Sequence, residues 1–118
     1  MNRPALDLAL RNRITSSWRT ARTTNAPEAW TTLAEAHILS QPWATLHVRT
    51  HLEMLRLAVR SRDPREVVGQ AIRVIVAAPG SLTGRYPIGN TGRSNVSMFE
   101  PMPVPDELAE LLPPGASR

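Results

Sequence analysis

Residues 43–61 read WATLHVRTHLEMLRLAVRS, and this stretch decides the fold. At about 100° of rotation per residue, the polar side of a helix here is a narrow strip. That strip consists of Arg49, Glu53, Arg56 and Arg60. The rest of the circumference is mostly apolar, and two histidines lie within it. The pattern therefore predicts a helix over residues 43–61 with a wide buried face.

Two helices are predicted before this one. The first covers residues 4–22, with an apolar stripe at helical spacing: Leu6, Leu10, Ile14, Trp18 and Ala21. The second covers residues 25–40. It opens at Asn25 and Glu28, which have capping-box spacing, and Pro42 blocks its continuation.

A fourth helix is predicted over residues 63–78. Asp63, Pro64 and Glu66 supply an N-cap, a proline at the first helical position and an acid three residues after the cap. Pro79-Gly80 is expected to end the helix. Its wide apolar face is predicted to pack inward, with the polar residues on the opposite side: Glu66, Gln70 and Arg73.

The remaining chain is rich in proline and glycine. Residues 79–118 hold seven of the eleven prolines and five of the six glycines. Because this part also has apolar residues, we expect residues 79–104 to wrap over the bundle rather than to be disordered. A short helix over residues 105–112 would dock through Leu108, Leu111 and Leu112, and residues 113–118 would fray.

These elements predict one all-α domain over residues 1–118. Short links favour four antiparallel helices arranged as stacked αα-hairpins. The spacing of Ala29, Leu33 and Ala36 is similar to that in the second helix of a tetratricopeptide unit, which suggests a bundle of that type.

Composition narrows the classes of function. The chain has no cysteine, which excludes disulfides and thiolate metal ligands. All fourteen basic residues are arginine, but ten acidic residues are interleaved with them and aromatic residues make up 4%, which argues against a nucleic-acid surface. No apolar run is long enough to cross a membrane, and the N-terminus lacks a signal core. We expect a cytoplasmic protein without a membrane partner.

The three histidines are the most specific feature. His47 and His51 lie four residues apart in the apolar arc of their helix, so both project inward. His37 lies on the buried face of the preceding helix, and antiparallel packing would bring it close to the pair. Three neutral imidazoles predict a site for a divalent ion, zinc or similar.

Each ring nitrogen that does not bind the ion needs a hydrogen-bond partner, and the candidates are Thr50, Asn90 and Asn95. No inward carboxylate is predicted, so no general base is visible and catalysis stays an open question. Residues 89–97 are dense in turn formers and are interpreted as turns that fasten the tail. The other interpretation is a lid over the histidines.

A second hypothesis gives the histidines no ligand role. In it the rings are packing residues of a helical protein-interaction module, and the chain dimerises through its first helix. Replacing all three histidines would then leave partner binding intact.

Several motifs together resemble a known family pattern: Ala36-His37-Ile38-Leu39, His47-Val48-Arg49-Thr50-His51, Val67-Val68-Gly69-Gln70, Gly89-Asn90-Thr91-Gly92 and Pro101-Met102-Pro103-Val104-Pro105. Over residues 10–112 the chain resembles a bacterial family known as a domain of unknown function, number 3703. It departs from that pattern at Arg93, where glycine is usual, and at Met98, where proline is usual. The resemblance implies a small, mostly helical bacterial protein and includes the three histidine positions, but it implies no activity.

Overall fold

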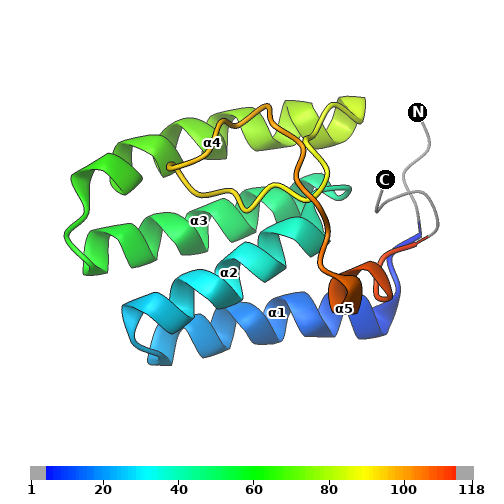
Figure 1. Cartoon of the computed structure of the whole chain (residues 1–118), viewed down its shortest axis with the longest axis horizontal. Coiled ribbons are helices and arrows are strands. Elements are labelled where there is room, and N and C mark those ends of the chain that lie inside the picture. The colour runs from blue at the N-terminus through cyan, green and yellow to red at the C-terminus, as the bar shows by residue number, and fades with distance from the viewer. Residues whose placement is uncertain (1–4, 114–118) are drawn as a thin grey trace.

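A computed structural model describes residues 5–113 of the chain. These residues form five helices and no strand: α1 (Leu8–Thr23), α2 (Ala26–Ser40), α3 (Ala44–Arg60), α4 (Pro64–Thr83) and α5 (Asp106–Ala109). Figure 1 shows α1 to α4 side by side, with successive helices running in opposite directions. α3 packs against α4 on one side and against α2 and α1 on the other. The all-α class is confirmed, and the likeness to a tetratricopeptide bundle stays a prediction.

The helix starts follow their capping residues. Asp63 caps α4 by accepting a hydrogen bond from the Glu66 amide at 3.2 Å, as predicted. Asp7 caps α1 in the same way, by accepting from the Ala9 amide at 2.7 Å. The helix therefore begins at Leu8, later than the predicted residue 4. Pro4, the predicted first residue, lies outside the described residues. Asn25 occupies the N-cap of α2, but its side chain makes no capping hydrogen bond.

The end of α4 differs from the prediction. Pro79 lies inside the helix, which continues to Thr83. A proline removes one backbone donor, but its φ is compatible with a helix, so Pro79 does not end α4. The stop comes at Gly84, whose φ of 72° is left-handed. The proline- and glycine-rich segment therefore starts at residue 84 instead of residue 79.

α4 is also oriented opposite to the prediction. Its buried face is mostly polar, while many of its apolar side chains are exposed, among them Val68, Ile72 and Ile75. The buried residues recur at helical spacing and face α3: Glu66, Gln70, Arg73, Ala77 and Ser81. Burial of a polar side chain requires a hydrogen-bond partner. Arg73 donates to backbone carbonyls of α4 and of the loop, and the partners of Glu66, Gln70 and Ser81 are described with the site below.

The apolar core lies between α1, α2 and α3. The stripe predicted for the first helix is buried from Leu10 onward, and Leu6 packs against the core from outside the helix. Trp18 also donates from Nε1 to the Thr50 hydroxyl at 3.0 Å. Dimerisation through the first helix stays a prediction; on the described surface, large exposed apolar side chains are concentrated on α4.

Glu53 is buried, although the sequence pattern placed it on the polar strip. Its carboxylate accepts hydrogen bonds from Arg22 at 2.6 and 2.9 Å and from Arg49 at 3.2 Å. These bonds join α1 to α3, because Arg22 belongs to the end of α1. Burial raises the pKa of Glu53, but the bonds from Arg22 and Arg49 outweigh it, and the net pKa lies below the ordinary value.

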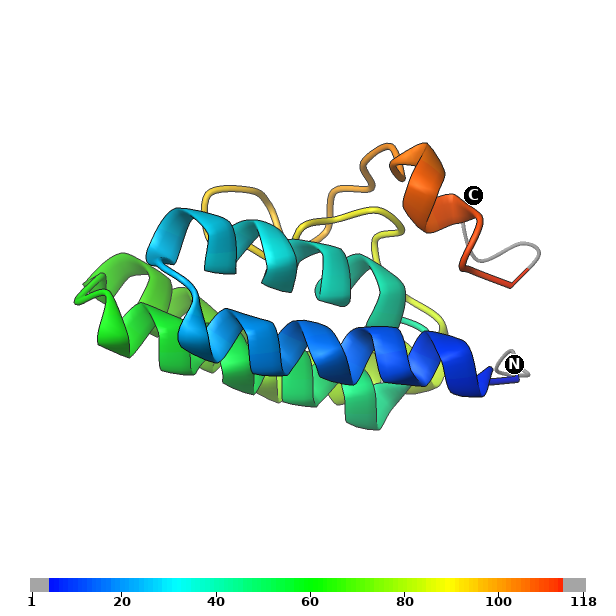
Figure 2. The ribbon, with the colours of Figure 1, turned by 90° about the horizontal axis from the view of Figure 1, so that it is seen from below.

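Residues 84–105 and α5 lie on the α2 side of the bundle, away from α1 (Figure 2). The Met102 amide donates to the Ile88 carbonyl at 2.9 Å, which closes this segment on itself. α5 is shorter than predicted; Leu108 and Leu112 are buried, whereas Leu111 is exposed. Of the predicted frayed end, residues 114–118 lie outside the described chain. None of the described helices has the length and apolarity that a membrane crossing requires.

Candidate metal centre

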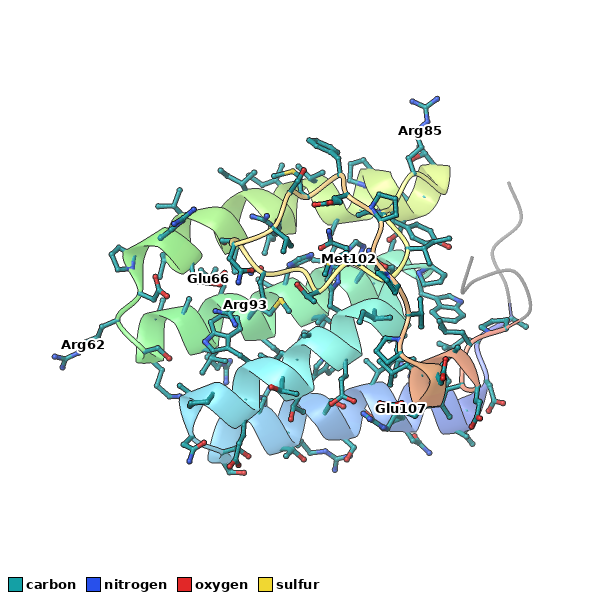
Figure 3. All side chains as sticks on the ribbon, viewed as in Figure 1. Arg62, Glu66, Arg85, Arg93, Met102 and Glu107 are labelled. Atoms are coloured by element: carbon teal, nitrogen blue, oxygen red, sulfur yellow. The ribbon has the colours of Figure 1, made fainter. Side chains whose placement is uncertain are left out.

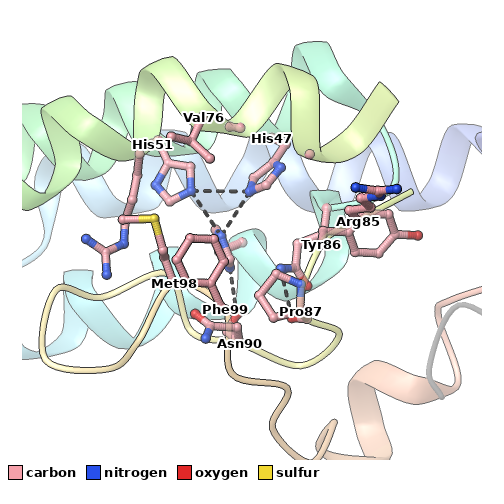
Figure 4. A pocket seen from close by; sticks show the side chains of 14 residues that line it. His47, His51, Val76, Arg85, Tyr86, Pro87, Asn90, Met98 and Phe99 are labelled. Atoms are coloured by element: carbon pink, nitrogen blue, oxygen red, sulfur yellow. Dashed lines mark hydrogen bonds between the residues drawn. The ribbon is translucent and has the colours of Figure 1, made fainter. Parts of the chain in front are cut away.

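Three buried histidines meet between α2, α3 and α4. His37 comes from α2, and His47 and His51 come from successive turns of α3. The three Nε2 atoms form a nearly equilateral triangle. His37 Nε2 lies 3.1 Å from each of the other two, which are 3.2 Å apart. The predicted convergence of the three rings is therefore present (Figure 4, dashed lines).

The protonation of His37 follows from its backbone partner. Its Nδ1 lies 2.6 Å from the Asn90 carbonyl oxygen. A carbonyl oxygen can only accept, so Nδ1 carries the proton. The neutral ring then has an unprotonated Nε2, which faces the other two rings.

His51 is fixed in the same way by Gln70 on α4. Its Nδ1 lies 2.7 Å from Gln70 Oε1. The amide group cannot be reversed, because Gln70 Nε2 donates to the Gly92 carbonyl at 2.9 Å. His51 Nδ1 therefore donates, and its Nε2 is unprotonated.

His47 is fixed by Ser81, three turns further along α4. Its Nδ1 lies 2.8 Å from the Ser81 hydroxyl, and that hydroxyl donates its only proton to the Gln41 carbonyl. Ser81 must therefore accept from His47. All three Nε2 lone pairs consequently point into one small space with no proton between them.

Three unprotonated Nε2 atoms repel one another, and a proton between them would remove this repulsion. Burial opposes that protonation. Burial is the largest cause that lowers each pKa, and neighbouring histidines lower those of His37 and His47 further. The pKa falls well below the ordinary value for His37, to about 3 for His47 and to about 4 for His51. At neutral pH the cluster thus consists of three neutral imidazoles whose unprotonated Nε2 atoms face one another. This arrangement attracts a cation.

A carboxylate lies behind the cluster, contrary to the prediction that none points inward. Glu66 is buried and accepts from Arg93 at 2.9 Å and from the Ser94 amide at 2.6 Å. Figure 3 shows Glu66 and Arg93 facing one another. Burial raises the pKa of Glu66, but the bonds from Ser94 and Arg93 bring it below the ordinary value. The carboxylate is therefore an ionised anchor for the loop.

The loop that contains residues 89–97 supports the centre from outside. The Asn90 side chain donates to the Ser97 and Glu100 carbonyls, both at 2.8 Å, and accepts from the Gly92 amide at 2.8 Å. These bonds fix the backbone carbonyl that receives His37. These bonds are turns of the kind predicted for residues 89–97, whereas a role as a lid over the histidines stays a prediction.

A family model described as a protein of unknown function (DUF3703) matches residues 5–112. The chain belongs to this family. No curated protein and no solved structure gives a significant match. The DUF3703 match spans the three histidines and every acceptor that fixes them.

Of the three partners predicted for the rings, Asn90 alone contacts one. Thr50 points toward α1 and α2, where its hydroxyl bonds to Trp18 and Ser40, and it also donates to the Leu46 carbonyl of its own helix. Asn95 is exposed on the loop. Arg93, where the DUF3703 pattern was expected to have glycine, pairs with Glu66 and lies over the Trp30 ring at 3.9 Å.

Sequence reasoning missed Gln70 and Ser81 as partners of the rings. Both lie on the polar stripe of α4, eleven residues or three turns apart. Gln70 was assigned to a polar stripe that faces solvent, and Ser81 lay beyond the helix end predicted at residue 78. Both errors had to be corrected, the orientation of the helix and its length, before the two side chains could be placed against the histidines.

Proposed function

We propose that this protein binds one divalent transition-metal ion, zinc or similar, through Nε2 of His37, His47 and His51. The observation that supports the proposal is the commitment of all three Nδ1 protons to acceptors that are fixed in turn. Metal-binding histidines typically donate their other ring nitrogen in this way.

The size of the triangle supports coordination. With sides of 3.1 to 3.2 Å and zinc–nitrogen bonds of about 2.05 Å, an ion would lie about 1 Å above the plane of the three nitrogens. The angle between two such bonds would be about 100°, near the tetrahedral value. A fourth position then remains free on one side of the plane.

The donor set narrows the choice of ion. Three neutral imidazoles suit zinc, copper, nickel, cobalt or iron, whereas magnesium and calcium prefer oxygen ligands. Zinc has no geometric preference of its own and accepts near-tetrahedral sites readily. The use of the ion would be sequestration, delivery or metal-assisted chemistry on a small molecule.

The packing hypothesis has less support. Histidines that only pack would bond to backbone carbonyls or to one another. Nδ1 of His37 has such a carbonyl, but three Nε2 atoms that face one another need a proton on one atom of each facing pair. The fixed partners leave no such proton in three neutral rings.

Elemental analysis of protein purified without a histidine tag tests the proposal. We expect about one equivalent of metal per chain, lost in His51→Gln and retained in Arg56→Gln, an exposed position on the same helix. Metal below a tenth of an equivalent in the unsubstituted protein, before and after supplementation, would refute the proposal.

A further inference from the structure

A cavity of about 50 Å³ lies beside the three rings. A single water needs about 10–15 Å³ of such space, so the cavity has room for a small ion or a few waters. Its walls include Tyr86, Met98 and Phe99 from the loop segment, opposite His47 and His51 (Figure 4). Phe99 is largely exposed, so the cavity reaches the protein surface.

The charge in this cavity favours an anion. Among the described residues, its lining contains no carboxylate and two arginines: Arg73 is buried, whereas Arg85 is exposed and its side chain points away from the bundle (Figure 3). Glu66 lies outside the lining and is paired with Arg93. An ion held by three neutral imidazoles would keep its full double positive charge, and a buried charge of this kind requires compensation.

Gln41 adds a requirement for a hydrogen-bond donor. Its side chain lines the cavity and is almost fully buried. Its Nε2 donates to the Pro87 carbonyl at 3.0 Å, which fixes the orientation of the amide. Its Oε1 is buried without a hydrogen-bond partner in the described chain. A buried acceptor of this kind is stabilised when a molecule in the cavity donates to it.

We propose that the cavity binds the fourth ligand of the ion, a small oxygen monoanion whose O–H group donates to Gln41 Oε1. Hydroxide and hydrogencarbonate have this chemistry. The anion neutralises part of the ion's charge, and Gln41 selects anions that carry a hydrogen. This inference rests on the metal site proposed above.

The test uses cobalt(II), whose visible spectrum reports its coordination, as the bound ion. Hydrogencarbonate and azide are titrated separately; azide is an anion of similar charge without an O–H group. In the unsubstituted protein we expect both anions to change the spectrum. In Gln41→Met we expect hydrogencarbonate to bind at least about tenfold more weakly, because a hydrogen bond from a charged ligand is lost. Azide affinity should change less than about twofold.

Met98→Leu is the matched control, since it changes the cavity wall without removing a polar group, and it should leave both affinities unchanged. Failure to bind cobalt would overturn the metal site itself. Cobalt binding without a response to either anion would overturn only the fourth-ligand site. Equal weakening of both anions in Gln41→Met would show that Gln41 acts by holding Pro87, which would overturn its role as acceptor.

Discussion

Gly92 lies directly against the ring of His37: a Cβ atom on Gly92 would come within 2.6 Å of His37 Cδ2. Gly92 also has a φ of 81°, which residues with side chains rarely adopt. The absence of a side chain on Gly92 thus lets the loop pass close to a proposed metal ligand, and it explains part of the turn motif.

Gly92→Ala is therefore expected to displace the His37 ring and weaken zinc binding at least tenfold. Strain and overpacking should also cost about 1–3 kcal/mol of unfolding free energy. Competition with a coloured chelator and urea titration measure the two effects. Gly80→Ala is the control, because a Cβ there meets its nearest neighbour at an ordinary 3.5 Å. Unchanged zinc affinity in Gly92→Ala would contradict the expectation.

Gln70→Met should weaken zinc binding by about 10–100-fold, since it removes the acceptor that fixes His51. Thr50→Val removes a buried hydroxyl that accepts from Trp18 Nε1 but contacts no histidine nitrogen. It should lower stability by about 1–2 kcal/mol and leave zinc affinity within twofold. The same two measurements distinguish the variants, and equal affinities in both would count against the assignment of Gln70.

The convergence of the histidines could be predicted from the sequence, but the partners that fix them could not. His47 and His51 interrupt an apolar arc, so helical periodicity alone turns them inward. The same periodicity predicted that Gln70 faces solvent, because the pattern distinguishes only polar from apolar residues. It takes no account of the hydrogen-bond acceptors that buried imidazoles need. The bond to His37 comes from the backbone of Asn90, and any residue type has that carbonyl.

The orientation of α4 can be tested with one pair of substitutions. Ile75 is 77% exposed, so Ile75→Gln should change the unfolding free energy by less than about 0.5 kcal/mol. Ala77 is 3% exposed and faces the cluster, so Ala77→Gln should cost about 1–3 kcal/mol or more. If Ile75→Gln were the more damaging substitution, the apolar face of α4 would be the buried one.

The metal-free protein should lose stability as the pH falls from 6.5 toward 4. The unfolded chain binds protons on its histidines near pH 6.5, whereas burial keeps the folded pKa at about 3 for His47 and about 4 for His51. In this window the unfolded state binds more protons, so each histidine lowers stability by up to about 1.4 kcal/mol per pH unit. Urea titrations with a chelator, repeated across the window, measure the slope.

His47→Gln is the control for that slope and should reduce it by about a third. A slope that is unchanged by the substitution would assign the acid sensitivity to groups outside the cluster.

Glu53→Gln should cost about 1–2 kcal/mol, because the buried carboxylate receives bonds from both Arg22 and Arg49. Glu35→Gln removes a longer, half-exposed pair with Arg13 and should cost less than about 0.5 kcal/mol. Thermal or urea unfolding measures both, and equal costs would argue against the bridge between α1 and α3.

The acceptors for the imidazoles follow the imidazoles in the chain. His37, His47 and His51 are translated first, and Gln70, Ser81 and Asn90 come later. A nascent chain therefore has all three rings before anything selects their tautomers, and the acceptors arrive later on α4 and on the loop. Local opening of the loop around Asn90 would expose the rings without unfolding the helices. The residence time of an ion would then follow the lifetime of that closed loop more closely than the unfolding rate of the whole domain.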